Sequence, residues 1–332
     1  MKALKFFKDK GLILTEVPVP PLEEGEVLVR VKACSICGSD ARILKGEKSV
    51  PDGVTLGHEI GGVIHKSRNP SLKEGEKVTV FPSIFCKKCE NCERGFFNLC
   101  TNKKTLGYAL DGGFAEFVRI PKELVELGAV VKTDIEDFAV SSIVEPLGCV
   151  LNSFGVMGLQ PDSSLLIIGG GPLGLMHALV AHIQGIKTVF IADHHPERLK
   201  LAKRLNPRAV CCEDLSEVKR SGFDAVAMCA FAPDILEKAV SLCRAKGVVN
   251  LFAGGSWEKR AVICPNEIHY REKCLTGTHS TTLKLFRKAE KMALKHERIL
   301  RQIITHRFPL TEYKKAFETY TTRKGLKVSL IP

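Results

Sequence analysis

Four cysteines in a stretch of 15 residues have the spacing of a metal site. Zinc prefers thiolate ligands and is satisfied by a tetrahedral shell of four. A complete shell leaves no position for a substrate, so the spacing predicts a structural zinc site. An iron–sulfur cluster and a nucleic-acid zinc module are the alternatives. The pattern is C-x2-C-x2-C-x7-C, formed by Cys86, Cys89, Cys92 and Cys100.

A second, sparser set of residues could bind a catalytic metal. Cys37 lies in ACSICGSD, and 21 residues later His58 and Glu59 follow in LGHEIGG. A shell of cysteine, histidine and carboxylate leaves room for a water or a substrate oxygen. Taken singly, these residues could also be a core thiol, a turn histidine and a surface glutamate. Because they occur together with the other motifs, we predict a catalytic zinc site.

A glycine-rich turn predicts a dinucleotide site. The segment GGGPLG follows the apolar run at 165–168 and opens a helical pattern. Glycines in this context allow a tight turn and let the backbone approach a pyrophosphate, and the helix N-terminus offers free N–H groups to the phosphates. A glycine-rich turn that binds no nucleotide is the alternative. The expected cofactor-binding residues of the turn are Gly169, Gly171, Pro172, Leu173 and Gly174.

Asp193 is expected to select the cofactor. It stands 19 residues after Gly174, at the end of the predicted strand VFIAD. A carboxylate there accepts hydrogen bonds from the adenosine ribose and repels a 2′-phosphate, so NAD is favoured over NADP. Arg198 is expected at the same site. Its positive charge, with those of His194 and His195, could weaken the discrimination against NADP.

These motifs need two kinds of domain to position them. Residues 1–147 read as short strands broken by proline and glycine, which predicts an irregular, mostly-β catalytic domain. Residues 148–282 alternate between strand and helix patterns, which predicts right-handed crossovers and a parallel sheet. The predicted fold class is therefore α/β, with a doubly wound Rossmann nucleotide-binding domain, and residues 283–332 returning to the first domain.

Composition excludes several classes of function. The 332 residues are 45% hydrophobic and 26% charged, as in ordinary globular proteins. The most apolar window, 165–183, contains four glycines and a proline, so no membrane span is expected, and the N-terminus lacks a secretory signal. A cytoplasmic location makes the 13 cysteines metal ligands or buried thiols. The net charge of +12 is spread along the chain, so neither nucleic acid nor membrane is expected as a partner.

The order of the motifs identifies a family. Over essentially its whole length the sequence resembles the zinc-dependent medium-chain alcohol and polyol dehydrogenases, with CGSD, GHE and its glycine pair, the four-cysteine lobe, GGFAEF, EPLG and GGGPLG. The resemblance implies a GroES-like first domain, two zinc ions per subunit, and a homodimer or homotetramer. It makes Cys37 and His58 ligands of the catalytic zinc, with Glu59 and Glu145 as carboxylates that can enter or leave the shell.

Two residues and one segment indicate which branch of the family the sequence resembles. Glu145 lies in VEPLGC, where classical alcohol dehydrogenases usually have cysteine, so the chain is more similar to the polyol and L-threonine dehydrogenases. Arg42 stands where the family often has a histidine that passes protons to solvent. The segment THSTT at 278–282 lacks the arginine and tyrosine with which sorbitol dehydrogenases hold polyol hydroxyls.

The expected function is interconversion of a secondary alcohol of a polyol or sugar-derived substrate and its ketone, with zinc and NAD as cofactors. Zinc is expected to lower the pKa of the bound substrate oxygen. Ser39 is expected to accept the hydroxyl proton, because its hydroxyl can both donate and accept; a turn-capping serine is the alternative. We expect the substrate in the cleft between the domains. The expected catalytic residues are Cys37, Ser39, His58, Glu59 and Glu145.

Three other functions fit the same sequence. An L-threonine 3-dehydrogenase shares EPLG and the catalytic motif, and threonine carries a secondary alcohol. A sugar-phosphate or sugar-acid dehydrogenase would agree with Arg42 and the basic composition. A zinc- and nucleotide-binding module without catalysis is the third alternative, although such a module would need only the four-cysteine site.

Overall fold

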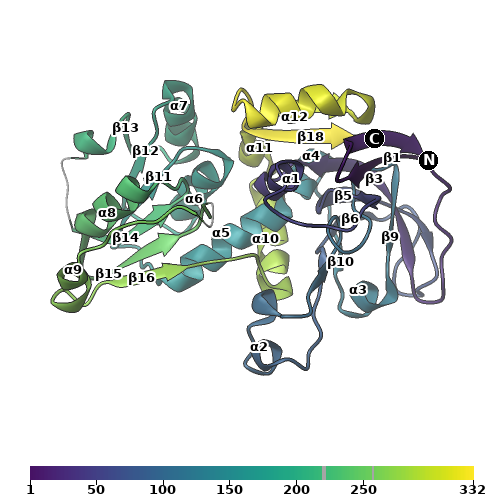
Figure 1. The fold of residues 1–332 in the computed structure, drawn as a ribbon, viewed down its shortest axis with the longest axis horizontal. Coiled ribbons are helices and arrows are strands. Elements are labelled where there is room, and N and C mark those ends of the chain that lie inside the picture. Colours follow the sequence, from purple (N-terminus) through teal and green to yellow (C-terminus); the bar gives the residue numbers. More distant parts are fainter. Residues whose placement is uncertain (219–221, 256–257) are drawn as a thin grey trace. The chain divides into compact units, whose positions relative to one another are not determined.

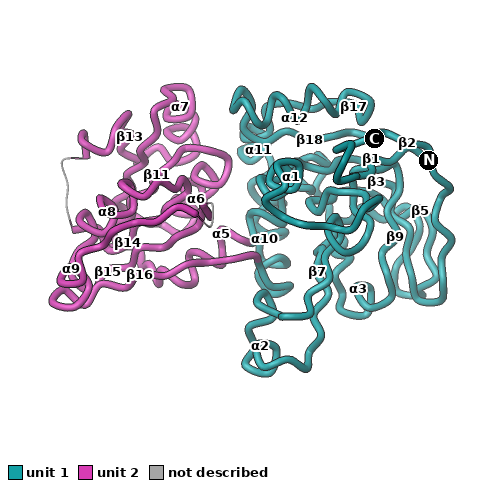
Figure 2. The backbone as a smooth tube through the Cα atoms, viewed as in Figure 1, with its two compact units in different colours: residues 1–148, 281–332 teal, residues 149–280 magenta. Residues whose placement is uncertain are grey.

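The computed structural model describes residues 1–218, 222–255 and 258–332 (Figure 1). The chain forms two compact units, shown in different colours in Figure 2. Unit 1 comprises Met1–Gly148 and Thr281–Pro332, and unit 2 comprises Cys149–Ser280. The sequence predicted domains of 1–147 with 283–332 and of 148–282. That the two units act as the catalytic and the nucleotide-binding domain stays a proposal.

Unit 1 is built around a mainly antiparallel sheet, and smaller sheets adjoin it. The large sheet has the order β10-β6-β5-β3-β18-β17, and β9 also pairs with β3. Its strands are β3 (Val27–Ser35), β5 (Glu59–Ser67), β6 (Lys77–Val80), β9 (Phe117–Ile120), β10 (Val130–Lys132), β17 (Ile304–Pro309) and β18 (Lys327–Ile331). The smaller sheets contain β1 (Lys2–Phe7), β2 (Gly11–Glu16) and β4 (Val54–Thr55), and β7 (Ser83–Ile84) with β8 (Lys104–Thr105).

Strand β3 occupies the middle of this sheet. Its sequence VLVRVKACS buries every residue except Arg30 and Lys32, so it carries side chains into the core along most of its length. The last strand of the chain, β18, pairs antiparallel with the end of β3, where Ser329 lies opposite Ser35. The hydroxyl of Ser35 hydrogen-bonds the hydroxyls of Ser329 and Ser142 at 2.7 and 2.6 Å. The C-terminal strand therefore completes the core of unit 1.

The helices of unit 1 are short except for two near the C-terminus. Helix α12 packs against β17 and β18, and Figure 1 shows it beside β18. The helices are α1 (Gly38–Leu44), α2 (Glu90–Glu93), α3 (Lys122–Glu126), α4 (Phe138–Ser142), α10 (Leu283–Lys295), α11 (Glu297–Leu300) and α12 (Tyr313–Thr321). Helix α5 (Val144–Met157) contains the boundary between the units. Short 3-10 turns occur at Phe97–Leu99, Leu215–Glu217, Arg301–Ile303 and Leu310–Glu312.

Unit 2 contains the predicted parallel sheet, in the order β13-β12-β11-β14-β15-β16. The order reverses at β11, so right-handed crossovers place α6 and α7 on one face and α8 on the other. The strands are β11 (Ser164–Ile168), β12 (Thr188–Ala192), β13 (Val210–Cys212), β14 (Phe223–Met228), β15 (Cys243–Leu251) and β16 (Cys274–Gly277). The helices are α6 (Pro172–Ile183), α7 (Pro196–Leu205), α8 (Pro233–Leu242) and α9 (Pro265–His269).

The alternation of strands and helices in unit 2 agrees with the pattern predicted for residues 148–282. Strand β15 begins at Cys243, directly after α8 ends, and buried Cys243 pairs with Phe223 of β14. Within the described ranges, we find no helix that is both long enough and apolar enough to cross a bilayer.

Candidate active site

The glycine-rich turn joins β11 to α6. Gly169 has a φ of +102°, which favours glycine, and a Cβ atom on Gly174 would collide with the carbonyl oxygen of Gly169. Gly171 is the N-cap of α6, and Pro172 and Leu173 begin the helix. Gly169 therefore makes the tight turn that the sequence predicted, and Gly174 lets the first turn of α6 pack directly against that turn. The free N–H groups of the first helical turn suit a pyrophosphate.

Asp193 follows β12 and is tied to this turn. Its Oδ2 accepts a hydrogen bond from the Gly170 amide at 2.7 Å and lies 3.4 Å from Arg198 Nη1. Its Oδ1 accepts from the His195 amide at 2.9 Å and lies 2.8 Å from His195 Nδ1. Burial raises the pKa of Asp193, but the hydrogen bonds from His195 and Gly170 outweigh it and hold the pKa below its usual value. The carboxylate is ionised and surrounded by donors of the chain.

The structure brings Cys37, His58 and Glu59 together. Their ligand atoms all lie within 4.8 Å of one another. Cys37 is the N-cap of α1, and Glu59 is the first residue of β5. They meet because β3 and β5 pair antiparallel with Ser35 opposite Glu59, so that the end of one strand lies beside the start of the other.

The polar atoms of this group fit a metal ion. Glu59 Oε2 and His58 Nδ1 are buried without a hydrogen-bond partner, which is costly unless a ligand or a nearby charge compensates. His58 Nδ1 lies 3.7 Å from the carboxylate of Asp40, which also accepts a hydrogen bond from the Cys37 amide at 2.9 Å. A carboxylate behind one ring nitrogen orients the other nitrogen as a metal ligand. Here that nitrogen is Nε2.

The charges around the group favour a thiolate at Cys37. Burial raises the pKa of Cys37, but the neighbouring His58, with help from Lys327, outweighs burial and lowers the pKa to about 7. Thiolates are the form of cysteine that binds metals. Glu59 is anchored from the other side, since its Oε1 lies 2.6 Å from the buried ammonium of Lys327. Cys37, His58 and Glu59 thus offer a mixed set of donors that suits zinc.

Two hydroxyls stand beside this group. Tyr108 donates its hydroxyl to Ser39 Oγ at 2.6 Å, and the same hydroxyl lies 3.5 Å from His58 Nε2. The rings of Tyr108 and His58 are in contact, with centroids 5.0 Å apart. The Tyr108 hydroxyl thus links Ser39 to His58, and Tyr108 is a residue that the sequence patterns did not single out. Proton transfer through Ser39 stays a prediction.

Two other expected residues stand apart from the three ligands. Glu145 is buried in the first turn of α5 and is outside the compact group. Burial raises the pKa of Glu59, and the charge of Glu145 adds to that shift. Arg42 is half-exposed and pairs with Glu47 at 3.1 Å. Arg42 is therefore engaged with a neighbouring carboxylate of its own segment.

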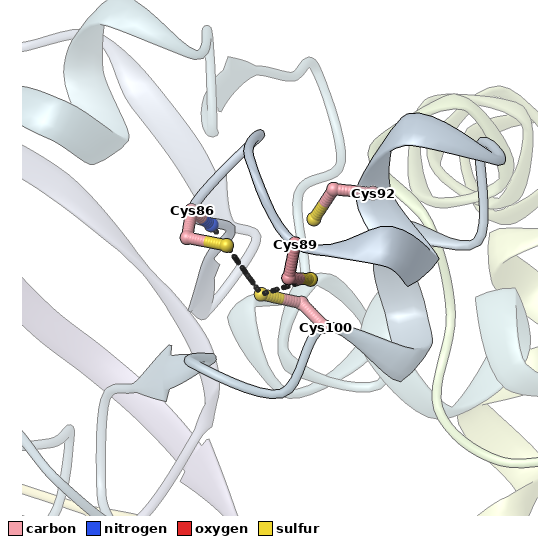
Figure 3. Close-up of side chains that lie close together, drawn as sticks. All are labelled: Cys86, Cys89, Cys92 and Cys100. Atoms are coloured by element: carbon pink, nitrogen blue, oxygen red, sulfur yellow. Dashed lines mark hydrogen bonds between the residues drawn. The ribbon is translucent and has the colours of Figure 1, made fainter.

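The four cysteines form a second compact group, shown in Figure 3. All of them are free thiols, and the sulfur of Cys100 lies 3.5 Å from that of Cys86 and 3.9 Å from that of Cys89. A tetrahedron with Zn–S distances of about 2.3 Å has sulfur–sulfur edges of about 3.8 Å. Backbone hydrogen bonds from Thr101 and Cys92 lower the pKa of Cys89 to about 6. Burial and hydrogen bonds with Cys89 and Cys100 raise the pKa of Cys92 to about 12, so a metal ion would have to displace the proton of that thiol. The sulfur–sulfur distances fit a closed zinc shell.

Two family models match the chain. Residues 23–129 match the alcohol dehydrogenase GroES-like domain, and residues 142–329, more than half of the chain, match the glucose dehydrogenase C-terminus. The chain belongs to the zinc-dependent medium-chain dehydrogenase family. This confirms the resemblance and the predicted fold class, a GroES-like domain with a Rossmann domain. It also confirms that the protein is an enzyme, so the non-catalytic module is excluded.

Similar proteins extend over nearly the full length. D-altritol 5-dehydrogenase of Agrobacterium fabrum is 32% identical over 324 residues, 94% of this chain and 94% of that protein. L-threonine 3-dehydrogenase of Bacillus subtilis is 29% identical and covers 97% of this chain and 95% of its own length. A protein of Sinorhizobium meliloti 1021 described as a zinc-binding dehydrogenase, solved with NADP bound, has a TM-score of 0.92 at 26% identity and covers 100% of this chain and 99% of its own.

These relatives confirm the predicted types of cofactor. Zinc and a nicotinamide nucleotide are the cofactors of this chain's family, and both groups of metal donors are present. The preference for NAD over NADP stays a prediction, because the structure from Sinorhizobium meliloti holds NADP.

Proposed function

We propose that this protein oxidises a secondary alcohol of a polyol or sugar-derived compound to the ketone, with NAD as the hydride acceptor, and catalyses the reverse reduction. The observation that carries the proposal is the juxtaposition of Cys37, His58 and Glu59 with the Ser39 hydroxyl. A metal site with an open position beside a proton acceptor suits deprotonation of an alcohol. The polyol relative from Agrobacterium fabrum supports this substrate class.

Each residue of the group has a separate task in this proposal. A bound zinc ion supplies a Lewis acid that lowers the pKa of a substrate hydroxyl. Cys37 and His58 hold the metal, and Asp40 keeps the His58 ring oriented. Glu59 offers Oε2 while Lys327 engages its other oxygen.

The hydroxyl pair handles the proton. Tyr108 donates into one lone pair of Ser39 Oγ, which leaves the second lone pair to accept the proton of the substrate hydroxyl. When the substrate proton arrives on Oγ, the proton that Ser39 already carries passes to solvent water, because Ser39 is only partly buried. The carbon-bound hydrogen then departs as hydride toward NAD, whose pyrophosphate we assign to the turn at Gly169–Gly174 and whose ribose we assign to Asp193.

Glu145 is proposed to assist exchange at the metal. Its carboxylate is buried near Glu59, and its charge acts on that residue. A second carboxylate that can approach the metal helps a substrate oxygen replace water. The homodimer or homotetramer implied by the family resemblance and the cytoplasmic location belong to the same proposal.

L-threonine is a second substrate to test, because the L-threonine 3-dehydrogenase of Bacillus subtilis is similar to this chain over nearly its whole length. The test is the appearance of reduced nicotinamide with NAD or NADP and a panel of alditols, aldonates, alditol phosphates and L-threonine. We expect oxidation of a polyol or sugar derivative that is lost in Cys37→Ser and retained in Cys264→Ser, whose thiol is exposed. Oxidation of threonine alone would replace the polyol proposal, and no oxidation at all would contradict the function.

A further inference from the structure

Lys48 places a positive charge beside the candidate active site. It lies in the loop between α1 and β4, and its Nζ is 3.2 Å from the centroid of the Tyr108 ring. The hydroxyl of the same ring reaches both Ser39 and His58. A single aromatic ring therefore separates the ammonium of Lys48 from the residues proposed to deprotonate the alcohol.

No described carboxylate forms an ion pair with Lys48. In the same segment Arg42 pairs with Glu47 at 3.1 Å, whereas no salt bridge or hydrogen bond joins Lys48 to any residue the structure describes. Lys48 is partly buried, and burial lowers its pKa to about 8, while the charges of Cys37 and Asp40 oppose the shift and those of Lys103 and Arg42 add to it.

This arrangement costs free energy when no ligand is bound. An ammonium partly withdrawn from water needs a partner, and the face of one ring compensates for only part of the lost hydration. The nearby cations of Lys103 and Arg42 repel it further. A purely structural lysine at this place would gain more from a carboxylate partner. An anion supplied by the ligand would complete the site.

We propose that Lys48 is a specificity-determining residue that binds an anionic group of the substrate, so that the preferred substrates are anionic sugar derivatives. The shared chemistry is a carboxylate or a phosphate a few bonds from the reacting alcohol. The inference rests on the proposed function and narrows its substrate class. A neutral polyol would offer this ammonium only hydroxyl oxygens as hydrogen-bond acceptors, whereas an anionic substrate also supplies the counter-charge.

The test compares matched substrates in matched variants. An alditol, the aldonate of the same configuration and the alditol phosphate are assayed with the wild type, Lys48→Met, Lys48→Arg and Lys45→Ala. Met is an unbranched, apolar side chain one atom shorter than Lys and removes the charge, and Lys45 is an exposed lysine of the same segment. The three substrates separate a carboxylate from a phosphate as the source of the anion.

We expect the wild type to prefer one anionic substrate. Lys48→Met should lose about tenfold to hundredfold in kcat/KM for that substrate, mainly through KM, as for the loss of a charged hydrogen bond. The factor by which Lys48→Met lowers kcat/KM for the neutral alditol should be at least about tenfold smaller than for the anionic substrate. Lys48→Arg should restore part of the preference, and Lys45→Ala should behave as the wild type.

Calorimetric titration of the enzyme–NADH complex with the aldonate and the phosphate gives a readout without turnover. The preferred anion should bind the wild type and bind Lys48→Met at least about tenfold more weakly. A wild type that prefers the neutral alditol, or a Lys48→Met variant that loses equally on neutral and anionic substrates, overturns the inference while the proposed function stands. Oxidation of no substrate, with the anion still bound through Lys48, would instead contradict the proposed function.

Discussion

The buried ammonium of Lys327 lies 2.6 Å from Glu59 Oε1 and donates a second hydrogen bond to the carbonyl oxygen of Ile36 at 3.1 Å. Lys327 begins β18 and Glu59 begins β5, and both strands border β3. Ile36 immediately precedes Cys37. The last strand of the chain thus fixes both sides of the candidate metal site, although it is 268 residues distant from Glu59.

Lys327→Met should destabilise the metal-loaded protein. Removal of the ammonium leaves Oε1 of Glu59 buried without its donor, and breaking a buried ion pair in this way costs about 3–5 kcal/mol in the free energy of unfolding. Urea denaturation measures the loss, with Lys324→Met, at an exposed position, as the control. The double variant Lys327→Met/Glu59→Gln should recover part of the stability. A change below about 1 kcal/mol in Lys327→Met would show that the pair is not what anchors Glu59.

Tyr108→Phe should lower turnover through Ser39. The variant keeps the ring but removes the hydroxyl that donates to Ser39 Oγ at 2.6 Å. We expect kcat to fall about tenfold to hundredfold, and more in Ser39→Ala, as for the loss of groups in acid–base catalysis. Because Tyr108 acts through Ser39, the double variant should be no slower than Ser39→Ala alone. Additive losses would show that Tyr108 acts independently, and Tyr270→Phe, on an exposed ring, is the control.

Asp193→Ser should narrow the preference for NAD. Loss of the carboxylate removes hydrogen bonds to the ribose and the repulsion of a 2′-phosphate, worth about 1.5–3 kcal/mol, or roughly tenfold or more in the KM for NAD. Asp193 also accepts a hydrogen bond from the Gly170 amide, so Asp193→Ser removes a contact of the glycine-rich turn as well. Asp193→Asn keeps an oxygen for that hydrogen bond but removes the charge. A thermal melt of both variants separates a change in cofactor preference from a loosened turn. A wild type that uses NADP better than NAD would contradict this role, with Arg198 and His195 as the cations that admit the phosphate.

His177 predicts a pH dependence of stability. Its side chain is fully buried, with Nδ1 2.7 Å from the Leu173 carbonyl oxygen and Nε2 3.0 Å from Ser153 Oγ. Burial lowers the pKa of His177 from 6.5 to about 4. The unfolded chain gains a proton near pH 6.5, but the folded chain gains it only near pH 4. The contribution of His177 to stability is therefore complete above about pH 6.5 and is lost as the pH falls toward about 4.

The expected loss between pH 7 and pH 5.5 is about 1 kcal/mol from this residue. Urea denaturation at pH 7 and at pH 5.5 measures the loss in the free energy of unfolding. This loss should be about 1 kcal/mol smaller in His177→Gln than in the wild type. His269→Gln, on an exposed ring, should keep the full dependence of the wild type. Equal pH dependence in His177→Gln and the wild type would mean that the folded protein accepts a proton on His177 without cost.

The parts of the site that the sequence predicted are those with a local signal. The four cysteines lie in 15 consecutive residues, and the glycine turn sits between one strand and one helix, so spacing alone brings their atoms together. The pairing of Cys37 with His58 and Glu59 depends on the register of β3 and β5. No local pattern encodes that register, and only the resemblance to a family could supply it.

The residues that sequence reasoning missed act over long distances. Lys327 reaches Glu59 through the insertion of β18, and Tyr108 reaches Ser39 across 69 residues. Neither position carries a spacing signal. Asp40 could have been predicted from the sequence, because it lies three residues after Cys37 in a capping box at the start of α1. An acid at that position of a helix cap, next to a candidate ligand, points to a role in holding the ligand.

The central claim is that Cys37, His58 and Glu59 hold a catalytic zinc ion distinct from the ion of the four cysteines. Its most direct test is the zinc content per chain of purified wild type, Cys37→Ser and the control Cys264→Ser, measured beside alcohol oxidation. We predict about two zinc ions per chain in the wild type and in Cys264→Ser, and about one, with a folded but inactive protein, in Cys37→Ser. A Cys37→Ser variant that keeps two zinc ions, or a wild type that is fully active with one, would contradict the account.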